Sequence, residues 1–449
     1  MKHFGVLLTA LLSLALPLGS AEGQQSVDTA LESDYKAGLL LLGGDGTPAS
    51  IDVIQAIKLF QGAAAKGHPA AMAQLAIAYS DGTAGFTKDN GEAQSWALQA
   101  IITGIEEYAK TSPAGQADLA ALYWKGLGVS PNSVKAARLL EAAANQRNLR
   151  AEDMLGSLYQ VGDGVAKDLN MARDLRERAA NSGFASAQLH LGGMYAKGDG
   201  VERDITTARQ LYEKAAIQGD APAQNALGAL YISGNGVEKD YGKAREWYLK
   251  AATQENSDAQ FNLGNLYRLG HGVERSYKVA REWYTKAANH GDKDAQNGLG
   301  NFYATGLGVE KDYGIAREWY MKAANQGDAN AEWSLGCLYA NGLGVEQDYR
   351  VAREWHLKAA DQGHASAQNS IGALYLNGRG VEKDYRIARE WYTKAANNGN
   401  PEAQFNLGSI YLNGLGVERD YEKAREWFGK AANQGDRDAS NTLKQIRGK

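Results

Sequence analysis

The chain has 449 residues, of which 44% are hydrophobic, and a formal net charge of -4 from 48 basic and 52 acidic residues. This near balance, with acids and bases interleaved, disfavours nucleic acid and anionic membrane surfaces as partners, because both attract a basic stripe. The only cysteine is Cys337, so no disulfide can form within the chain. We interpret Cys337 as a small, half-buried residue without a chemical role.

Residues 1–21 differ in kind from the rest of the chain. A basic start precedes an apolar run from Phe4 to Leu16, and small residues end at Ala21. This pattern predicts a secretory signal peptide cleaved after Ala21, with an apolar run too short to cross a bilayer. No cysteine follows the leader and no later segment is apolar enough for a transmembrane helix, so we expect neither a lipid anchor nor a membrane span. The expected location is the periplasm, with secretion as the alternative.

The rest of the chain is organised by a period of 36 residues. Large residues recur at that interval in two columns, one through Trp247 and one from Tyr123 to Tyr411. The first column contains Leu139, Leu175, Leu211, Trp247, Trp283, Trp319, Trp355, Trp391 and Trp427. A strict period of this length is typical of stacked units that contact mainly their neighbours. The sequence therefore predicts one elongated repeat solenoid instead of the two or three globular domains that its length would allow.

We divide the chain after the leader into three parts. Residues 22–112 hold two degenerate repeats, and the second gains eight residues over the standard 36, mostly near residues 102–111. Nine regular repeats fill residues 113–436. Residues 437–449 are predicted to form a C-terminal capping helix, because apolar residues keep to one side of it and the remainder is polar.

Each repeat is predicted to form two helices, as in residues 221–256. The first helix covers about residues 221–232, with Asp220 as its N-cap, and it ends at a G-x-G-V turn whose glycines allow the left-handed conformation. The second helix covers about residues 241–253 and is capped by Asp240. Its predicted buried stripe consists of Ala244, Trp247, Tyr248 and Ala251. A lone helix pair cannot bury that stripe, so stability must come from stacking.

The recurring pattern AxxxLGxLYxxGxGVxxDYxxAxxWYxKAAxxG resembles the Sel-one-like repeat family, which is related to tetratricopeptide repeats. The resemblance covers residues 29–449, and the first two repeats depart from the pattern. It implies an all-α, right-handed superhelical solenoid of about eleven 36-residue helix pairs, used as an adaptor or ligand-binding surface without catalysis. Exported bacterial members include host-interaction factors. Others resemble periplasmic immunity proteins that neutralise antibacterial lipase effectors delivered by type VI secretion.

Motifs for catalysis or ligand binding are weak. The G-x-G-V turn follows a helix instead of a strand and lacks the remaining residues of a phosphate loop, so we interpret it as loop geometry. The histidines show no zinc-ligand spacing. His356 is expected to pack in place of a tyrosine, and His364 to replace a helix cap. No Ser/His/Asp set or carboxylate pair stands apart from the repeat, so we expect no catalytic residue, no metal and no cofactor.

An arginine also recurs in the second helix, which would suit anion binding. Each arginine lies between an alanine and an acid or glutamine, so we interpret the column as packed stems that pair with neighbouring acids. The column contains Arg173, Arg209, Arg245, Arg281, Arg317, Arg353, Arg389 and Arg425.

The most informative variation lies on the first helix of each repeat. On a helical wheel, positions 225, 229 and 232 lie opposite Leu227, and in tetratricopeptide-like solenoids this helix lines the concave surface. These positions mix asparagines with aromatic and apolar residues, which suits a protein or peptide partner. The candidate binding residues are Asn225, Phe261, Asn265, Arg268, Asn297, Asn301, Trp333, Asn369, Phe405 and Leu412. The alternative is that the aromatic members fill grooves between adjacent first helices.

These observations predict a non-enzymatic protein-binding solenoid in the bacterial envelope. The sharper hypothesis is a periplasmic immunity or inhibitor protein that occludes an antibacterial effector, because export would place the chain where such an effector acts. The alternative is a secreted or envelope adaptor that binds a host or cell-wall partner. A third class, an exported hydrolase acting on peptidoglycan or a β-lactam, would need a nucleophile–base pair that the sequence does not show.

Overall fold

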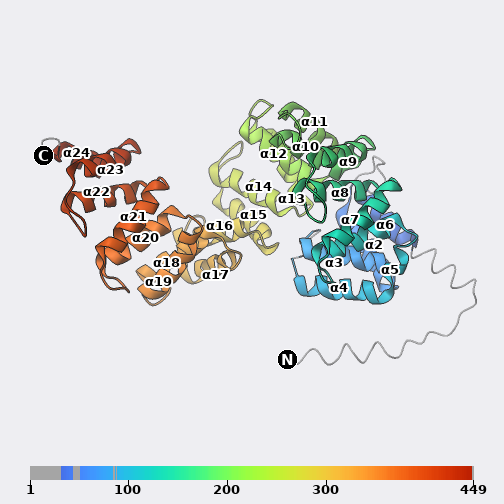
Figure 1. The fold of residues 1–449 in the computed structure, drawn as a ribbon, viewed down its shortest axis with the longest axis horizontal. Helices are drawn as coiled ribbons and strands as arrows, with labels where there is room; N and C mark the ends of the chain where they lie inside the picture. The colour runs from blue at the N-terminus through green and yellow to red at the C-terminus, as the bar shows by residue number, and fades with distance from the viewer. Residues whose placement is uncertain (1–31, 44–50, 84–85, 87, 447–449) are drawn as a thin grey trace, which may run out of the picture. The chain divides into compact units, whose positions relative to one another are not determined.

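The computed structural model describes residues 32–43, 51–83, 86 and 88–446, and its regular structure in these ranges is entirely helical (Figure 1). The predicted signal peptide lies outside the described residues. The chain divides into two compact units, Met1–Asn256 and Ser257–Lys449, called the N-terminal unit and the C-terminal unit below.

Within each unit, helices pair in chain order, the first of a repeat (helix A) with the second (helix B), and helix B then packs on the next helix A, except after the second repeat, where the next helix A packs on the preceding helix A. The A helices are residues 32–41, α3 (Pro69–Asp81), α6 (Pro113–Lys125), α8 (Leu149–Val161), α10 (Ala185–Lys197), α12 (Ala221–Ser233), α14 (Ser257–Leu269), α16 (Lys293–Thr305), α18 (Ala329–Asn341), α20 (Ala365–Asn377), α22 (Pro401–Asn413) and the terminal α24 (Arg437–Ile446). The B helices are α2 (Val53–Ala65), α4 (Asn90–Thr103), α7 (Ser133–Asn145), α9 (Leu169–Asn181), α11 (Ile205–Ile217), α13 (Tyr241–Thr253), α15 (Tyr277–Asn289), α17 (Tyr313–Ala324), α19 (Tyr349–Asp361), α21 (Tyr385–Asn397) and α23 (Tyr421–Asn433). The predicted all-α solenoid of helix pairs is confirmed.

The second repeat contains an additional short helix, α5 (Ile105–Tyr108). It follows α4 through Gly104, whose φ of 103° turns the chain. Ile105 is buried in the core of the first repeats and Tyr108 packs against the same core. The extra residues of this repeat are therefore part of its packed structure.

Side-chain caps begin the helices where the sequence places them. Asp220 accepts the Ala223 amide at 2.7 Å, and Asp240 accepts the Lys243 amide at 3.0 Å. His364 replaces an aspartate as predicted, since its Nδ1 accepts the Ala367 amide at 3.1 Å. Each cap satisfies an amide that the helix itself cannot bond.

The core of a repeat is built around a contact between a glycine of helix A and a ring of helix B. Tyr248 is only 4% exposed, and a Cβ added to Gly228 would stand 2.5 Å from its ring. The two helices reach this distance because glycine has no side chain. The equivalent pairs are Gly192–Tyr212, Gly264–Tyr284, Gly300–Tyr320, Gly336–His356, Gly372–Tyr392 and Gly408–Phe428. His356 thus takes the place of a tyrosine in the core, as predicted.

The tryptophan column is less buried than predicted. Trp247 packs with one side on the core that α11 and α12 form, and Lys250 Nζ lies 4.1 Å from the ring centroid. The prediction of a buried stripe is correct for Ala244, Tyr248 and Ala251 and wrong for Trp247, which is half-buried because it packs at the edge of that core with the exposed Lys250 over its ring. The same lysine–tryptophan contact recurs in the next five repeats at 3.9 to 4.3 Å.

A buried glutamine joins neighbouring repeats. Gln224 Nε2 donates to the Ala216 carbonyl of the preceding helix B at 3.1 Å, and its Oε1 accepts from Gln254 Nε2 at 2.9 Å. An Ala-Gln pair at the same 36-residue spacing is the sequence signal of these bonds. The glutamine can be buried because both ends of its amide are bonded.

The arginine column has two kinds of partner. Arg209 pairs with Glu213 in the same helix at 2.5 Å, as predicted. In the C-terminal unit, Arg281 instead donates to the carbonyl of Gly308, a turn glycine of the next repeat, at 3.2 Å. Gly308 has a φ of 68°, and a Cβ there would stand 2.5 Å from Tyr277 Cβ, so the G-x-G-V turn needs this glycine for conformation and for packing.

Replacing Gly300 with alanine is expected to lower the free energy of unfolding by about 1–3 kcal/mol, because the methyl group must displace a ring. The added Cβ would stand 2.4 Å from Tyr320. Gly429→Ala is the matched control, since Gly429 lies within α23 and a Cβ there meets nothing within 4 Å. The control should stabilise the chain by roughly 0.5–1 kcal/mol through helix propensity. Urea unfolding measures both values, and equal effects would contradict the packing role of Gly300.

Asp292→Asn is expected to remove a pH-dependent loss of folding stability. Burial raises the pKa of Asp292 to about 6, from an ordinary value of 3.8, so the folded state binds this proton more tightly than the unfolded state. The charged carboxylate therefore destabilises the fold above pH 6, and the cost disappears as the pH falls from 6 toward 4. Asn400 caps α22 in the equivalent position with a 2.7 Å bond to the Ala403 amide, so asparagine keeps the cap.

At pH 7 the Asp292→Asn variant should be more stable than the wild type by about 1 kcal/mol, after allowance for partial water access. Near pH 4 the two should have the same free energy of unfolding. Unfolding measured from pH 4 to 8 tests this, and a constant difference across that range would contradict the raised pKa.

Candidate functional site

A groove of about 340 Å³ lies between α14 and α16 in the C-terminal unit. It is lined by Phe261, Asn265, Arg268, Tyr284, Asp294, Asn297, Gly298, Asn301, Phe302, Thr305 and Leu307. Half of the predicted binding residues therefore meet around one feature, called the α14–α16 groove below. These five residues are Phe261, Asn265, Arg268, Asn297 and Asn301.

Tyrosines of the B helices fix the orientation of two groove asparagines. The Tyr284 hydroxyl donates to Asn265 Oδ1 at 2.6 Å and accepts from Arg268 Nε at 3.1 Å. The Tyr320 hydroxyl donates to Asn301 Oδ1 at 2.7 Å. Burial raises the pKa of Tyr320 to about 12 and also raises the pKa of Tyr284, so both hydroxyls stay protonated. With their oxygens bonded, the two amides keep their nitrogens as donors for a ligand.

Aromatic rings form the apolar wall of the groove. Phe261 stacks on Tyr284 with ring centroids 5.1 Å apart, and Phe302 lies 5.4 Å from the same ring. Gly298 adds no side chain, whereas a Cβ there would stand 2.6 Å from Tyr284. Asn297 Oδ1 is buried beside this wall without a hydrogen-bond partner in the described part of the chain, so it is an acceptor that a ligand could satisfy.

The aromatic candidates also pack within the solenoid. Phe405 lies 5.3 Å from Phe428, and Trp333 packs on the core that α19 and α20 form, with its Nε1 3.4 Å from Ser370 Oγ. Phe261, Trp333 and Phe405 are all half-buried. Each ring thus contributes to packing with one side and leaves part of its surface to solvent, and contact of that surface with a ligand stays a prediction.

The remaining candidates lie away from the groove. Asn369 donates to Glu402 at 3.2 Å and accepts from Asn406 at 3.1 Å, so its amide is occupied by the next A helix, α22. Leu412 packs against the last core of the C-terminal unit. Asn225 is half-buried in the N-terminal unit.

In the N-terminal unit, the corresponding face of the A helices is filled by its own side chains. Asp118 of α6 is fully buried and accepts hydrogen bonds from the Tyr35 hydroxyl, from Gln74 Nε2 at 2.6 Å and from Arg150 Nη1. Burial raises the pKa of Asp118, and the Arg150 guanidinium opposes that rise. These side chains come from the A helices of the first four repeats, so they join those helices directly.

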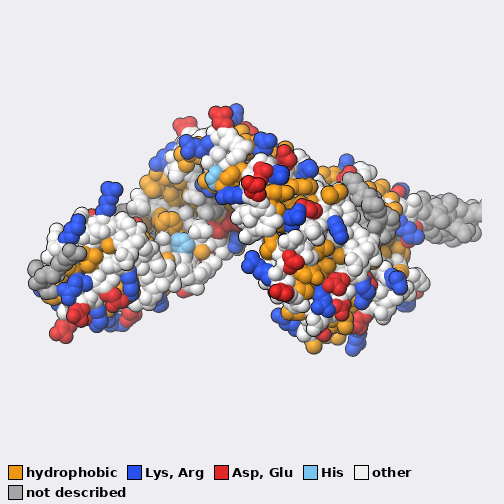
Figure 2. Space-filling model, turned by 90° about the horizontal axis from the view of Figure 1, so that it is seen from above, with side chains coloured by type: hydrophobic (Ala, Val, Ile, Leu, Met, Phe, Trp, Pro, Cys, Tyr) orange, Lys and Arg blue, Asp and Glu red, His pale blue; other side chains and the backbone are white. Residues whose placement is uncertain are grey.

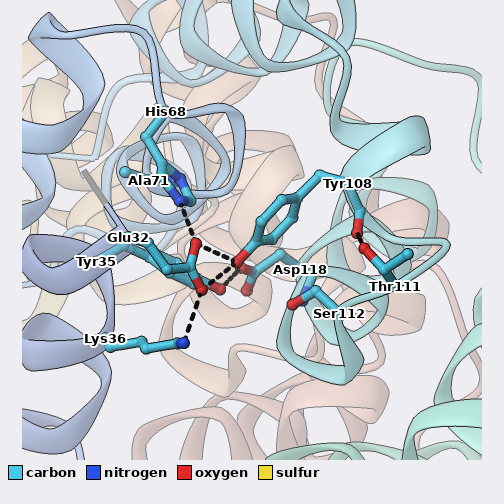
Figure 3. Close-up of polar contacts among 10 residues, drawn as sticks. Glu32, Tyr35, Lys36, His68, Ala71, Tyr108, Thr111, Ser112 and Asp118 are labelled. Atoms are coloured by element: carbon cyan, nitrogen blue, oxygen red, sulfur yellow. Dashed lines mark hydrogen bonds and ion pairs between the residues drawn. The ribbon is translucent and has the colours of Figure 1, made fainter. Parts of the chain in front are cut away.

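Glu32 completes this network at the edge of a hollow of about 800 Å³ (Figure 3). Its carboxylate lies 3.1 Å from His68 Nε2 and 3.2 Å from Lys36 Nζ, and it accepts from the Tyr108 hydroxyl at 3.0 Å. The Tyr35 ring stacks on His68 with centroids 4.5 Å apart. The polar groups on this face are therefore bonded to one another, in contrast to the donors of the α14–α16 groove.

A serine, a histidine and an aspartate meet in the N-terminal unit, although the sequence showed no such set. Ser186 Oγ donates to Asp153 at 2.7 Å, and His190 Nδ1 lies 2.9 Å from the same carboxylate and 3.5 Å from Ser186 Oγ. In a catalytic triad the serine pairs with the other ring nitrogen, Nε2. Here Ser186 and Asp153 both contact Nδ1 of His190, so the ring does not lie between the serine and the aspartate as it does in a catalytic triad. The set was missed because Asp153 lies one repeat before the other two residues.

Charges on the surface are mixed. On the face shown in Figure 2, acidic and basic side chains are interspersed over the helices. Within the described ranges, no three His, Cys, Asp or Glu side chains are grouped as metal ligands would be. None of the described helices has the length and apolar character that crossing a membrane requires.

Comparison with known proteins identifies one repeat type along almost the whole chain. A family model described as Sel1 repeat matches residues 31–68, 69–101, 113–148, 149–184, 185–220, 221–256, 257–292, 293–328, 329–364, 365–400 and 401–436. No curated protein matches the chain.

Solved structures show the same fold. The crystal structure of c5321, described as a protective antigen of uropathogenic Escherichia coli with an SLR fold, is 35% identical over 95% of this chain and 89% of that chain, with a TM-score of 0.62. A Sel1 repeat protein from Oxalobacter formigenes is 35% identical over 54% of this chain and 96% of that chain, with a TM-score of 0.51. The immunity protein Pa5087 of Pseudomonas aeruginosa is 26% identical over 48% of this chain and 81% of that chain, but its TM-score of 0.34 is too low to support a functional argument.

Replacing Tyr35 with phenylalanine is expected to destabilise the N-terminal unit by about 1–3 kcal/mol, because the fully buried Asp118 loses a donor. Tyr349→Phe is the control, since the Tyr349 hydroxyl only accepts an exposed bond from Gln347 at 3.0 Å. The control should change the free energy of unfolding by less than about 0.5 kcal/mol. Chemical unfolding of both variants measures the difference. A loss no larger for Tyr35 than for Tyr349 would show that the buried network does not hold this face together.

Proposed function

Since this chain belongs to the Sel1 repeat family, we propose that it is a non-enzymatic protein-binding solenoid that engages its partner through the A-helix face of the C-terminal unit. Solenoids of this family are typically interaction scaffolds. The observation that carries the proposal is the α14–α16 groove, where half of the predicted binding residues surround one open feature.

The contrast between the two units supports this assignment of the binding face. In the N-terminal unit, polar side chains of the A helices bond one another, as Asp118 does with Tyr35 and Gln74. In the groove, the Asn265 and Asn301 amides keep free donors, and Asn297 Oδ1 has no partner among the described residues. Unused hydrogen-bonding groups beside an apolar wall favour recognition of another polypeptide.

The chemistry of the groove favours binding over catalysis. Its polar groups are carboxamides, an arginine, the exposed carboxylate of Asp294, a threonine and Tyr284, whose pKa is raised by burial. None of these is activated as a nucleophile by a neighbouring base, which acyl or glycosyl transfer requires. The Ser186, His190 and Asp153 set also lacks the triad arrangement.

For the finer role we propose a periplasmic immunity or inhibitor protein that occludes an exported effector. The predicted leader in residues 1–21 supports it, since it would direct the chain to the compartment where an effector acts. The second candidate is a secreted or envelope adaptor for a host protein. Similarity to c5321, which is described as a protective antigen, favours this second role, because an antigen that protects must be accessible to the host.

The proposal is tested by capture from bacterial envelope extract with the chain lacking its leader, residues 22–449. Thr305→Trp should reduce the amount of captured partner at least about tenfold, because Thr305 is exposed on the groove wall and an indole there would block it. Thr253→Trp should bind as the wild type does. Thr253 is also the last residue of its helix, is exposed and donates to a carbonyl of that helix, but lies outside the groove.

One stoichiometric bacterial enzyme whose activity falls on binding would support the immunity role. Capture of a host protein instead, with the same loss in Thr305→Trp, would support the adaptor role. Equal capture by Thr305→Trp and the wild type, with both chains folded by circular dichroism, would contradict binding through this face.

A further inference from the structure

We propose that the α14–α16 groove receives an extended segment of the partner that lies along the helices, with an acidic side chain at the Arg268 end, a basic side chain at the Asp294 end and an apolar side chain between them. This inference rests on the proposed function and specifies the chemistry of the partner.

The Arg268 end offers a positive charge held in one position. Its guanidinium bonds only neutral groups, the Tyr284 hydroxyl at 3.1 Å and Asn265 Oδ1 at 3.3 Å. Among the described residues no carboxylate pairs with it, although the side chain is half-buried. A guanidinium fixed in this way gains from a carboxylate that a ligand brings, through charge-assisted hydrogen bonds.

The opposite end is acidic. Asp294 lies in the first turn of α16 and Asp258 in the first turn of α14, and both are exposed. Asp292, the cap of α16, adds a third carboxyl, and the negative charges of Asp294 and Asp258 help to raise its pKa. A partner with a basic side chain here meets complementary charge, and one with an acidic side chain meets repulsion.

The separation of these ends sets the length of the segment. Arg268 is the second-last residue of α14, and Asp294 is the second residue of α16, so equivalent helices place them about ten residues apart along the axis. Ten helical residues rise about 15 Å. An extended chain covers that distance with four or five residues at about 3.3 Å each.

The middle of the groove suits one apolar side chain and the backbone around it. Phe261, Tyr284 and Phe302 form the wall, and the absence of a side chain at Gly298 leaves the space in front of Tyr284. The amide nitrogens of Asn265 and Asn301 can donate to carbonyls of the segment. Asn297 Oδ1 can accept a backbone N–H, so both polar groups of an extended chain have partners here.

The test is selection of twelve-residue peptides from a random phage-displayed library on immobilised chain 22–449. The wild type is expected to select peptides with an acidic and a basic residue four or five positions apart and an apolar residue between them. Selection on Arg268→Glu should exchange the acidic position for a basic one, and selection on Asp294→Lys should do the converse. Arg386→Glu is the control, because Arg386 is an exposed arginine of α21 that pairs with Glu390 at 3.0 Å outside the groove.

A synthetic peptide with the selected sequence then measures the effect in solution. Its Kd should rise at least about tenfold for Arg268→Glu, stay unchanged for Arg386→Glu, and recover when the acidic residue of the peptide is replaced by lysine. Melting curves show whether the Arg268→Glu variant is folded. If it is not, the Asp294→Lys variant tests the charge pattern independently, because the Asp294 side chain is exposed.

Two results would overturn the inference. One is a wild-type pool with no paired charges, and the other is a charge pattern that neither substitution changes. If either result is found and Thr305→Trp still abolishes capture of the natural partner, the proposed charge pattern is wrong but binding through this face is still supported. If Thr305→Trp captures the partner and selects the same peptides as the wild type, both proposals are wrong.

Discussion

The contact of a helix-A glycine with a helix-B ring determines how closely the two helices of a repeat approach. It also determines what the A face presents to a ligand. In the C-terminal unit the ring is a tyrosine in most repeats, and the hydroxyls of Tyr284 and Tyr320 reach asparagines of the groove. The helix-B tyrosine therefore does two things: its ring packs on the glycine in the core, and its hydroxyl orients an asparagine amide of the groove.

The fourth repeat has no ring at this position. Arg176 takes the place of the tyrosine opposite Gly156, and it is 2% exposed. A buried guanidinium needs polar partners, and it finds them on α8 in Ser157, at 2.9 Å, and Gln160, at 2.8 Å. Polar residues of this A helix are thus used inside the N-terminal unit. In this repeat, the residue that faces the glycine therefore occupies polar groups of its own A helix.

Much of the fold could be predicted because its determinants are local and periodic. Helix caps such as Asp240 and turn glycines such as Gly308 act within a few residues, so their spacing is visible in the sequence. Burial of Trp247 was misjudged because residue size does not show which side of a helix faces the seam between repeats. In the groove, the helical wheel identified Asn265 and its neighbours, but it gave no sign that a helix-B tyrosine would fix their amides. The Ser186–His190 set was also invisible, since its members come together only through the packing of α8 and α10.

In the C-terminal unit, the second glycine of a G-x-G-V turn packs on helix B of the repeat before it, as Gly308 does on Tyr277, so these joints are made by adjacent repeats. The α14–α16 groove needs two of them, residues 257–292 and 293–328. Gain or loss of whole repeats elsewhere would leave its walls, charges and amides unchanged. The recognition chemistry and the length of the solenoid can therefore vary independently, so a related chain with a different number of repeats could keep the same specificity.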